Sequence, residues 1–217
     1  MNHPQFHDGL SKRPTDGTER SKILPRLLDV GIVLILLLAT VAINLRMIRY
    51  GLNGIGDSRW HLTWLQHFSK QLFEGIVYPR WLAGTNFGYG SPTFVFYPPL
   101  VYYLGAGLKA LGLTFEQMVN TLFSGAIFFS GISFFIFGRS YWGRFPSLVG
   151  ALAYMLSPGI MYLTNGGGLA GLYSFVWSPL ILYFTHRSIY WPGDRLSGDR
   201  LTGGHWPGGH WPAIALD

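Results

Sequence analysis

Four apolar segments, each long enough to cross a lipid bilayer, constrain this chain more than any other feature of its sequence. They cover roughly residues 27–43, 117–138, 145–163 and 171–190. A transmembrane helix needs about 20 predominantly apolar residues, because the hydrocarbon core of a bilayer is about 30 Å thick. Backbone polar groups in that core must be paired within their own segment, which favours helices. The sequence therefore predicts an all-α integral membrane protein.

The charged residues indicate how these segments are oriented and which partners are excluded. Charged residues make up only 12% of the chain, and the net charge is +6. The basic residues accompany no RNA-binding motif and lie beside the apolar segments, as in the cytoplasmic loops of membrane proteins. Ten of the 16 lysine and arginine residues form these clusters, namely Lys12, Arg13, Arg20, Lys22, Arg26, Arg139, Arg144, Arg187, Arg195 and Arg200. We therefore expect the lipid bilayer as a partner and no nucleic acid. The lack of cysteine excludes a thiolate nucleophile and a cysteine-ligated metal.

A fifth apolar segment, roughly 96–112, decides the predicted topology. It is short, and Pro98 and Pro99 predict that its helix begins near them. If it crosses, the chain has five transmembrane helices and the later basic clusters lie outside. If it does not cross, a cytoplasmic N-terminus places every basic cluster inside. We therefore predict about four transmembrane helices in the cell inner (plasma) membrane, with five crossings as the alternative. Residues 48–116 then form a large extracytoplasmic loop with juxtamembrane amphipathic helices, and residues 164–170 form a short second outer loop.

Composition divides the chain into three regions. Residues 1–22 are polar and rich in glycine, proline and charge, which predicts a disordered cytoplasmic N-terminus. Residues 23–190 form the membrane domain. Residues 191–217 contain two short repeats and are interpreted as a low-complexity tail.

The residues that follow the first apolar run predict an amphipathic helix over 57–75. At 100° per residue, its apolar stripe contains Trp60, Trp64 and Phe68, and Asp57 and His61 lie on the same stripe. A carboxylate and an imidazole on such a face are costly unless they meet a cavity, an ion or a substrate. The segment is therefore a candidate active-site element. Two plainer interpretations stay open: Asp57 caps the helix, and His61 is a satisfied interfacial histidine.

The rest of the predicted outer loop is rich in aromatic residues, glycine and proline. It contains Tyr-Pro-Arg-Trp at 78–81, Gly-Tyr-Gly-Ser-Pro at 88–92 and Phe-Tyr-Pro-Pro-Leu at 96–100. Glycine and proline prescribe a fixed path for the turns. Arg80 is suited to hold a phosphate through two parallel hydrogen bonds, although it could instead extend to lipid headgroups.

These motifs, together with an Asp shortly after the first membrane segment and a His four residues later, resemble the C-type-fold membrane glycosyltransferases. In particular, they resemble the bacterial and cyanobacterial membrane proteins labelled pyruvoyl-tetrahydropterin-synthase-related. The resemblance covers roughly residues 27–190. It implies the N-terminal portion of an enzyme that transfers a sugar from a polyprenyl-phosphate carrier to a hydroxyl acceptor on the extracytoplasmic side.

The resemblance also implies roles for individual residues. Asp57 is expected to be the catalytic base or a ligand of a divalent metal cation, with His61 assisting it. Arg80, Trp81 and Tyr97 are expected to bind the phosphate and the substrate. The alternative is a truncated, non-catalytic integral membrane protein that binds a lipid carrier or acts as a scaffold. A transporter built from paired four-span units is a more distant possibility.

Overall fold

The computed structural model describes residues 17–51 and 57–190, and these residues form helices and no strands. The helices are α1 (Gly17–Tyr50), α2 (Ser58–Phe73), the short 3₁₀ helix η1 (Asn86–Gly88), α3 (Thr93–Phe96), α4 (Leu100–Ala110), α5 (Phe115–Trp142), α6 (Arg144–Met155), α7 (Pro158–Gly166) and α8 (Leu169–Tyr190). The predicted all-α fold class is therefore confirmed. α1 begins within the segment that the sequence predicts to be disordered, whereas residues 1–16 and the predicted tail 191–217 lie outside the described residues.

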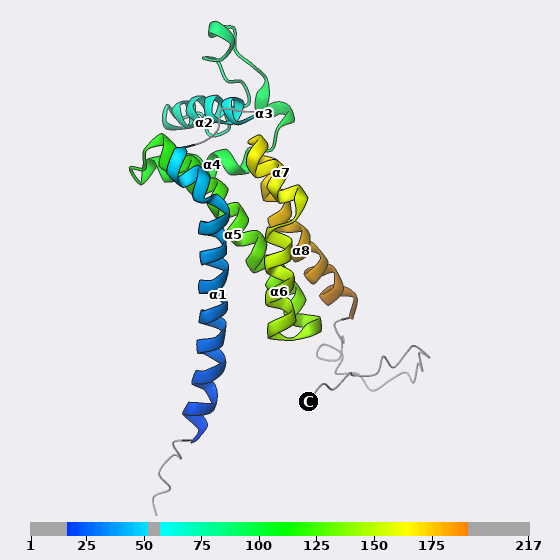
Figure 1. Ribbon diagram of the computed structural model, residues 1–217. Helices are drawn as coiled ribbons and strands as arrows, with labels where there is room; N and C mark the ends of the chain where they lie inside the picture. The colour runs from blue at the N-terminus through cyan, green and yellow to red at the C-terminus, as the bar shows by residue number, and fades with distance from the viewer. Residues whose placement is uncertain (1–16, 52–56, 191–217) are drawn as a thin grey trace, which may run out of the picture.

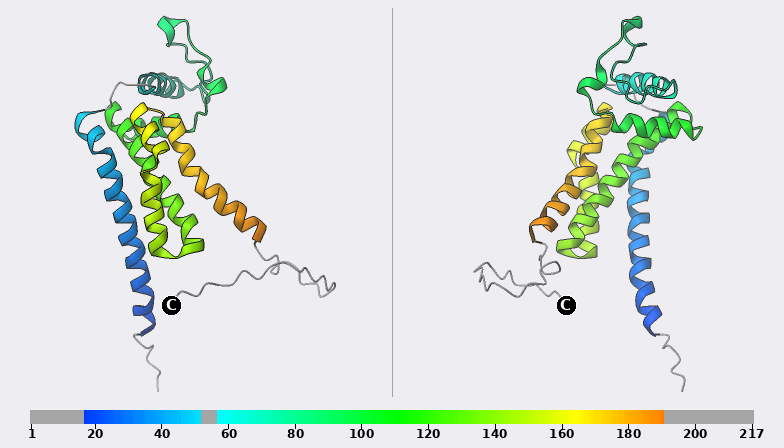
Figure 2. Two further views of the ribbon diagram at one scale, coloured as in Figure 1. Left: turned by 45° about the vertical axis from the view of Figure 1, so that its right-hand side comes forward. Right: turned by 180° about the vertical axis from the view of Figure 1, so that it is seen from behind.

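The long helices run up and down beside one another, as Figure 1 shows. α1 rises, α5 descends, α6 and α7 together rise again, and α8 descends. α2, η1, α3 and α4 lie across one end of this bundle, which we call the α2–α4 end. The start of α1, the turn between α5 and α6 and the last turn of α8 all point to the opposite end (Figure 2). We call this opposite end the basic end, because it carries Arg26, Arg139, Arg144 and Arg187.

Three helical segments are long and apolar enough to cross a membrane. They are Arg26–Tyr50, Phe115–Trp142 and Arg144–Gly166, the last of which combines α6 and α7. They agree with three of the four predicted spans. α8 has 22 residues but is not among these three segments; it contains Pro179, and Thr185, His186, Arg187 and Ser188 make its last two turns polar. α4, with 11 residues, is about 16 Å long at 1.5 Å per residue. It is therefore too short to cross a hydrocarbon core of about 30 Å.

The double proline separates α3 from α4, as the sequence predicts. α3 ends at Phe96, Tyr97 is extended with φ −108° and ψ 135°, and α4 begins at Leu100 with Pro99 at its N-cap. Proline lacks an amide hydrogen and fits best at the first turn of a helix, so the two prolines stop one helix and open the next. This break turns the chain so that α4 can lie across the bundle.

α2 packs against α4 through an aromatic core, and this packing corrects the predicted stripe. The buried residues of α2 are Ser58, His61, Leu65, Phe68 and Ser69, whereas Trp60 is 52% exposed. A Cβ at Gly105 of α4 would overlap the Leu65 side chain, so the missing side chain lets the two helices approach closely. The buried face is therefore rotated away from Trp60, because α2 packs against α4.

α5 is the central helix of the bundle, and close approach of its neighbours depends on small residues. A Cβ at Gly131 would lie 2.5 Å from the sulfur of Met155 in α6, and a Cβ at Gly150 would lie 2.6 Å from the Phe134 ring. Helices in membranes associate largely through such close packing, because lipid is as apolar as the side chains themselves. The α5–α6 hairpin is thus built to pack tightly.

Candidate functional site

Asp57 stands at the junction of α2 with the loop between α7 and α8. Its backbone N–H donates to the Gly166 carbonyl at 3.0 Å. The next residue, Gly167, has φ +78°, and a Cβ there would lie 2.5 Å from the backbone nitrogen of Ser58. Only glycine accepts this backbone conformation without strain while also leaving room for α2. The α7–α8 loop therefore fixes the position of the start of α2.

The Asp57 side chain is exposed and makes no hydrogen bond that caps α2. Asp57 occupies the N-cap position of α2, as the capping interpretation requires, but its side chain makes no capping hydrogen bond. Its negative charge raises the pKa of both His61 and Tyr97, although for each residue this effect is smaller than that of burial. The carboxylate thus lies within electrostatic reach of both side chains, and it forms no hydrogen bond with α2 that would keep it from a ligand.

His61 is held inside an aromatic cluster. It is 3% exposed, and its Nδ1 lies 2.6 Å from the Tyr102 hydroxyl in a hydrogen bond. Its ring also contacts Trp64 and Tyr97, with centroid distances of 5.5 and 5.7 Å. Burial lowers the pKa of His61 to about 4, so the imidazole is neutral at pH 7. His61 is therefore hydrogen-bonded to Tyr102 and too enclosed to exchange protons with a substrate directly.

Tyr97 and Tyr102 keep their hydroxyl protons at neutral pH. Burial raises the pKa of Tyr102, and burial together with the negative charge of Asp57 raises the pKa of Tyr97. Tyr97 is half-buried and packs against Trp64 at 5.2 Å between ring centroids. A protonated phenol near a free carboxylate can donate a hydrogen bond to an oxygen of a bound ligand.

The loop between α2 and α3, which contains Arg80 and Trp81, projects beyond α2 in Figure 1. Among the described residues, no hydrogen bond, ion pair or ring contact joins either side chain to Asp57 or His61. The Arg80 guanidinium is exposed and lies 5.4 Å from the centroid of the Tyr78 ring. Trp81 is 52% exposed and covers Gly90, where a Cβ would overlap its indole. Of the five predicted site residues, the structure thus groups Asp57, His61 and Tyr97.

The loop that carries Arg80 and Trp81 is internally tied. Leu82 and Ser91 exchange two backbone hydrogen bonds, of 2.8 and 3.2 Å, and the Asn86 amide donates to the Gly90 carbonyl at 3.0 Å. The Tyr78 hydroxyl donates to the Phe94 carbonyl at 2.7 Å. These bonds agree with the fixed turns that glycine and proline predict.

Two residues of the site are absent from the sequence-based prediction. Tyr102 is the hydrogen-bond partner of His61, 41 residues away in the chain. Gly167 sets the distance between the α7–α8 loop and α2. The run of three glycines at 166–168 is the only sequence signal that pointed toward Gly167, and no local pattern pairs His61 with Tyr102.

A metal centre built by the protein does not fit this site. Among the described residues, no group of three or more His, Asp or Glu side chains is arranged to hold a metal ion. Asp57 offers one carboxylate, and His61 is buried with Nδ1 already in a hydrogen bond. We therefore assign no chemical step to a metal.

Comparisons with protein families, with curated proteins and with solved structures gave no match for this chain.

Acid should destabilise the protein through His61. In the unfolded chain the His61 imidazole takes up a proton near pH 6.5, whereas in the folded protein the buried imidazole does so only near pH 4. The free energy of unfolding should therefore be highest above pH 7 and should fall by about 3 kcal/mol between pH 6.5 and 4. The measurement is the midpoint of thermal unfolding in detergent from pH 7.5 to 4.

The contribution of His61 is isolated by comparing variants. His61→Gln should lose this part of the pH dependence, whereas His67→Gln, on the same helix, should retain it. An acid-induced loss of equal size in wild type and His61→Gln would show that other groups cause it.

Proposed function

We propose that the protein takes part in membrane glycosyl transfer from a polyprenyl-phosphate-linked sugar to a hydroxyl acceptor, with Asp57 as the general base. The observation that carries this proposal is the state of Asp57. Its backbone is fixed by Gly166, yet its exposed carboxylate makes no capping bond. A carboxylate that is held in place and that no described residue pairs with is suited to act on a substrate.

The proposed reaction needs little more than a positioned base. The acceptor oxygen attacks the anomeric carbon, the bond from that carbon to the carrier phosphate oxygen breaks, and the phosphate leaves with the electron pair. Asp57 takes the proton of the acceptor hydroxyl. Tyr97, which stays protonated, can donate a hydrogen bond to a sugar or acceptor oxygen beside Asp57.

Arg80 is the proposed contact for the carrier phosphate. Arg80 is exposed, and among the described residues its guanidinium contacts the ring of Tyr78. A planar guanidinium can donate two parallel hydrogen bonds to phosphate. Trp81, half exposed on the same loop, would offer an aromatic face to the sugar or to the isoprenoid chain.

The direct test is a transfer assay on the full chain in lipid vesicles. Polyprenyl-phosphate-linked glucose, mannose and galactose, each labelled in the sugar, are supplied together with an extract of membrane glycoconjugates as acceptor. Transfer of label from the carrier to the extract supports the proposal. Intact carrier with all three sugars, from protein that is folded by thermal unfolding, counts against it.

A non-catalytic role is the second candidate, and one observation favours it. His61, the residue expected to assist Asp57, is buried and satisfied by Tyr102. In this case the protein would bind the carrier lipid without turnover. Retention of labelled polyprenyl phosphate by the vesicles, in the absence of transfer, would distinguish this role.

The proposed topology has a cytoplasmic basic end, four spans that include α8, and an extracytoplasmic α2–α4 end. It is supported by Arg26, Arg139, Arg144 and Arg187 at the basic end of the bundle and by the short length of α4. The plasma membrane is the expected location.

Cysteine labelling should place the chain before α4 and the chain after α4 both on the outer side. The natural chain has no cysteine, so single cysteines report their own position. Phe87→Cys and Leu111→Cys replace side chains that are 104% and 77% exposed. Both should react with an impermeant thiol reagent in intact cells, whereas Arg187→Cys should react only after lysis. Reaction at 87 with protection at 111 would instead favour five crossings.

A further inference from the structure

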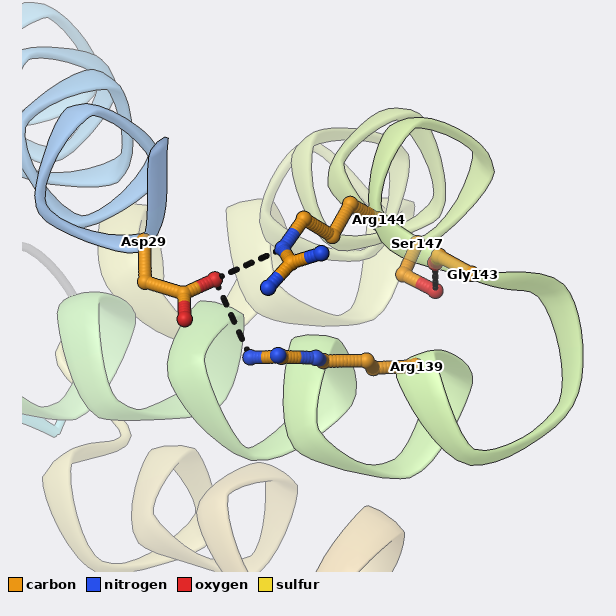
Figure 3. A network of polar contacts seen from close by, with 5 residues as sticks. All are labelled: Asp29, Arg139, Gly143, Arg144 and Ser147. Carbon is orange, nitrogen blue, oxygen red and sulfur yellow. Dashed lines mark hydrogen bonds and ion pairs between the residues drawn. The ribbon is translucent and has the colours of Figure 1, made fainter. Parts of the chain in front are cut away.

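Two arginines and one aspartate meet at the basic end, as Figure 3 shows. Arg139 Nη1 and Arg144 Nε both donate to Asp29 Oδ1, each at 3.0 Å. The cluster joins α1 to the end of α5 and the start of α6. Its three side chains are between 37% and 41% exposed, so they remain accessible from outside the protein.

The cluster has more positive charge and more donors than Asp29 can satisfy. Two guanidinium groups and one carboxylate leave a net charge of +1. Each guanidinium carries five N–H donors. Arg139 and Arg144 each give one of these to Asp29, and within the described part of the chain no other acceptor receives a hydrogen bond from either side chain. An anion with several oxygens could accept from both arginines at once.

The position of the cluster identifies the anion. Arg26, Trp142 and Arg144 are the limits, at the basic end, of the three segments that are long and apolar enough to cross a membrane. Asp29, Arg139 and Arg144 lie within three residues of these limits, so we infer that the cluster lies near the edge of the hydrocarbon region. Trp142 and Phe145, beside the two arginines in the sequence, are 55% and 75% exposed. Aromatic side chains at the limits of membrane helices lie among the lipid headgroups. The phosphates present in quantity at this depth are those of phospholipids.

We propose that Arg139 and Arg144, with Asp29 between them, form a binding site for the phosphate of an anionic phospholipid. The headgroup phosphate accepts hydrogen bonds from the free sides of both guanidinium groups. Asp29 holds the two arginines at the spacing that the phosphate meets, and it also reduces their charge. The site is at the opposite end of the bundle from Asp57, so this proposal does not depend on the proposed glycosyl transfer.

The test compares the full chain in lipid nanodiscs of phosphatidylcholine alone and of phosphatidylcholine with phosphatidylglycerol. Native mass spectrometry counts the phosphatidylglycerol retained. Each arginine near a membrane surface contributes about a five-fold change in affinity for anionic lipid. Arg139→Gln and Arg144→Gln should each weaken retention by more than that factor, because each variant loses hydrogen bonds to the phosphate as well as a positive charge. Arg49→Gln, near the other end of α1, is the matched control for the loss of one charge near a membrane surface, and its effect should not exceed that factor.

Asp29→Asn separates lipid binding from a purely structural role. It removes the competing carboxylate and raises the net charge of the cluster from +1 to +2, so retention of phosphatidylglycerol should increase several-fold. Thermal stability should fall in phosphatidylcholine and recover with phosphatidylglycerol, whose phosphate can bridge the two arginines. Equal loss in both lipids, with unchanged retention, would overturn the proposal.

Two further measurements cover the remaining outcomes. If Asp29→Asn does not fold, Arg144→Lys serves in its place; it keeps the charge but loses the planar fork, so retention should lie between wild type and Arg144→Gln. Inorganic phosphate at millimolar concentration should neither displace phosphatidylglycerol nor stabilise the protein in phosphatidylcholine. Displacement by free phosphate would show a soluble-anion site and would contradict the lipid assignment.

Discussion

Replacement of Gly167 by alanine should destabilise the α2–α4 end by about 2–5 kcal/mol. Two costs add in this estimate. A non-glycine residue at φ +78° costs about 1–2 kcal/mol. The new Cβ would also lie 2.5 Å from the backbone nitrogen of Ser58, and relief of such overpacking typically costs about 1–3 kcal/mol. Backbone atoms cannot rotate away, so the start of α2 has to move.

The neighbouring glycine provides a matched control. Gly166 ends α7, has no positive φ, and a Cβ there would meet nothing within 4 Å. Gly166→Ala should therefore be neutral or slightly stabilising, because alanine favours a helix more than glycine does. The measurement is thermal unfolding of both variants in the same detergent. Equal unfolding midpoints for the two variants would show that the close contact between Gly167 and Ser58 does not form.

The segments of the fold could be predicted because their signals are local. The limits of α5 and of the combined α6–α7 segment fall within a few residues of the predicted spans. Pro98 and Pro99 also predicted the start of α4 correctly, because proline restricts its own backbone and that of the preceding residue. A run of apolar residues or a proline affects the backbone only within a few residues of its own position. Such signals can therefore be interpreted from a single sequence.

The interior of the site could not be predicted because its contacts join distant segments. Helical periodicity placed Trp60 and His61 on one stripe, but only His61 is buried, since α4 covers one side of that stripe. The hydrogen bond between His61 and Tyr102 and the contact of Gly167 with Ser58 depend on how the helices are packed. The N-cap position of Asp57 was predicted correctly, yet the capping bond expected there does not form.

If the proposed function is right, Asp57→Asn should abolish sugar transfer and leave the fold intact. Loss of a positioned general base typically lowers the rate by about 10²–10⁴. Asparagine has nearly the same shape as aspartate and is accepted equally well at an N-cap. Because the Asp57 side chain makes no capping bond and is exposed, its exchange should leave the unfolding midpoint unchanged. The measurements are the transfer rate in vesicles and the thermal unfolding of the same preparation.

The control must remove a carboxylate from the same end of the bundle without touching the site. Glu74, at the far end of α2, is exposed and pairs with Lys70 at 3.9 Å, a contact that contributes little at a surface. Glu74→Gln should transfer sugar at the wild-type rate, which excludes a general effect of charge. Transfer by Asp57→Asn at the rate of Glu74→Gln would rule out the catalytic role of Asp57. The position of Asp57 beside Gly166 would then serve only to join α2 to the α7–α8 loop.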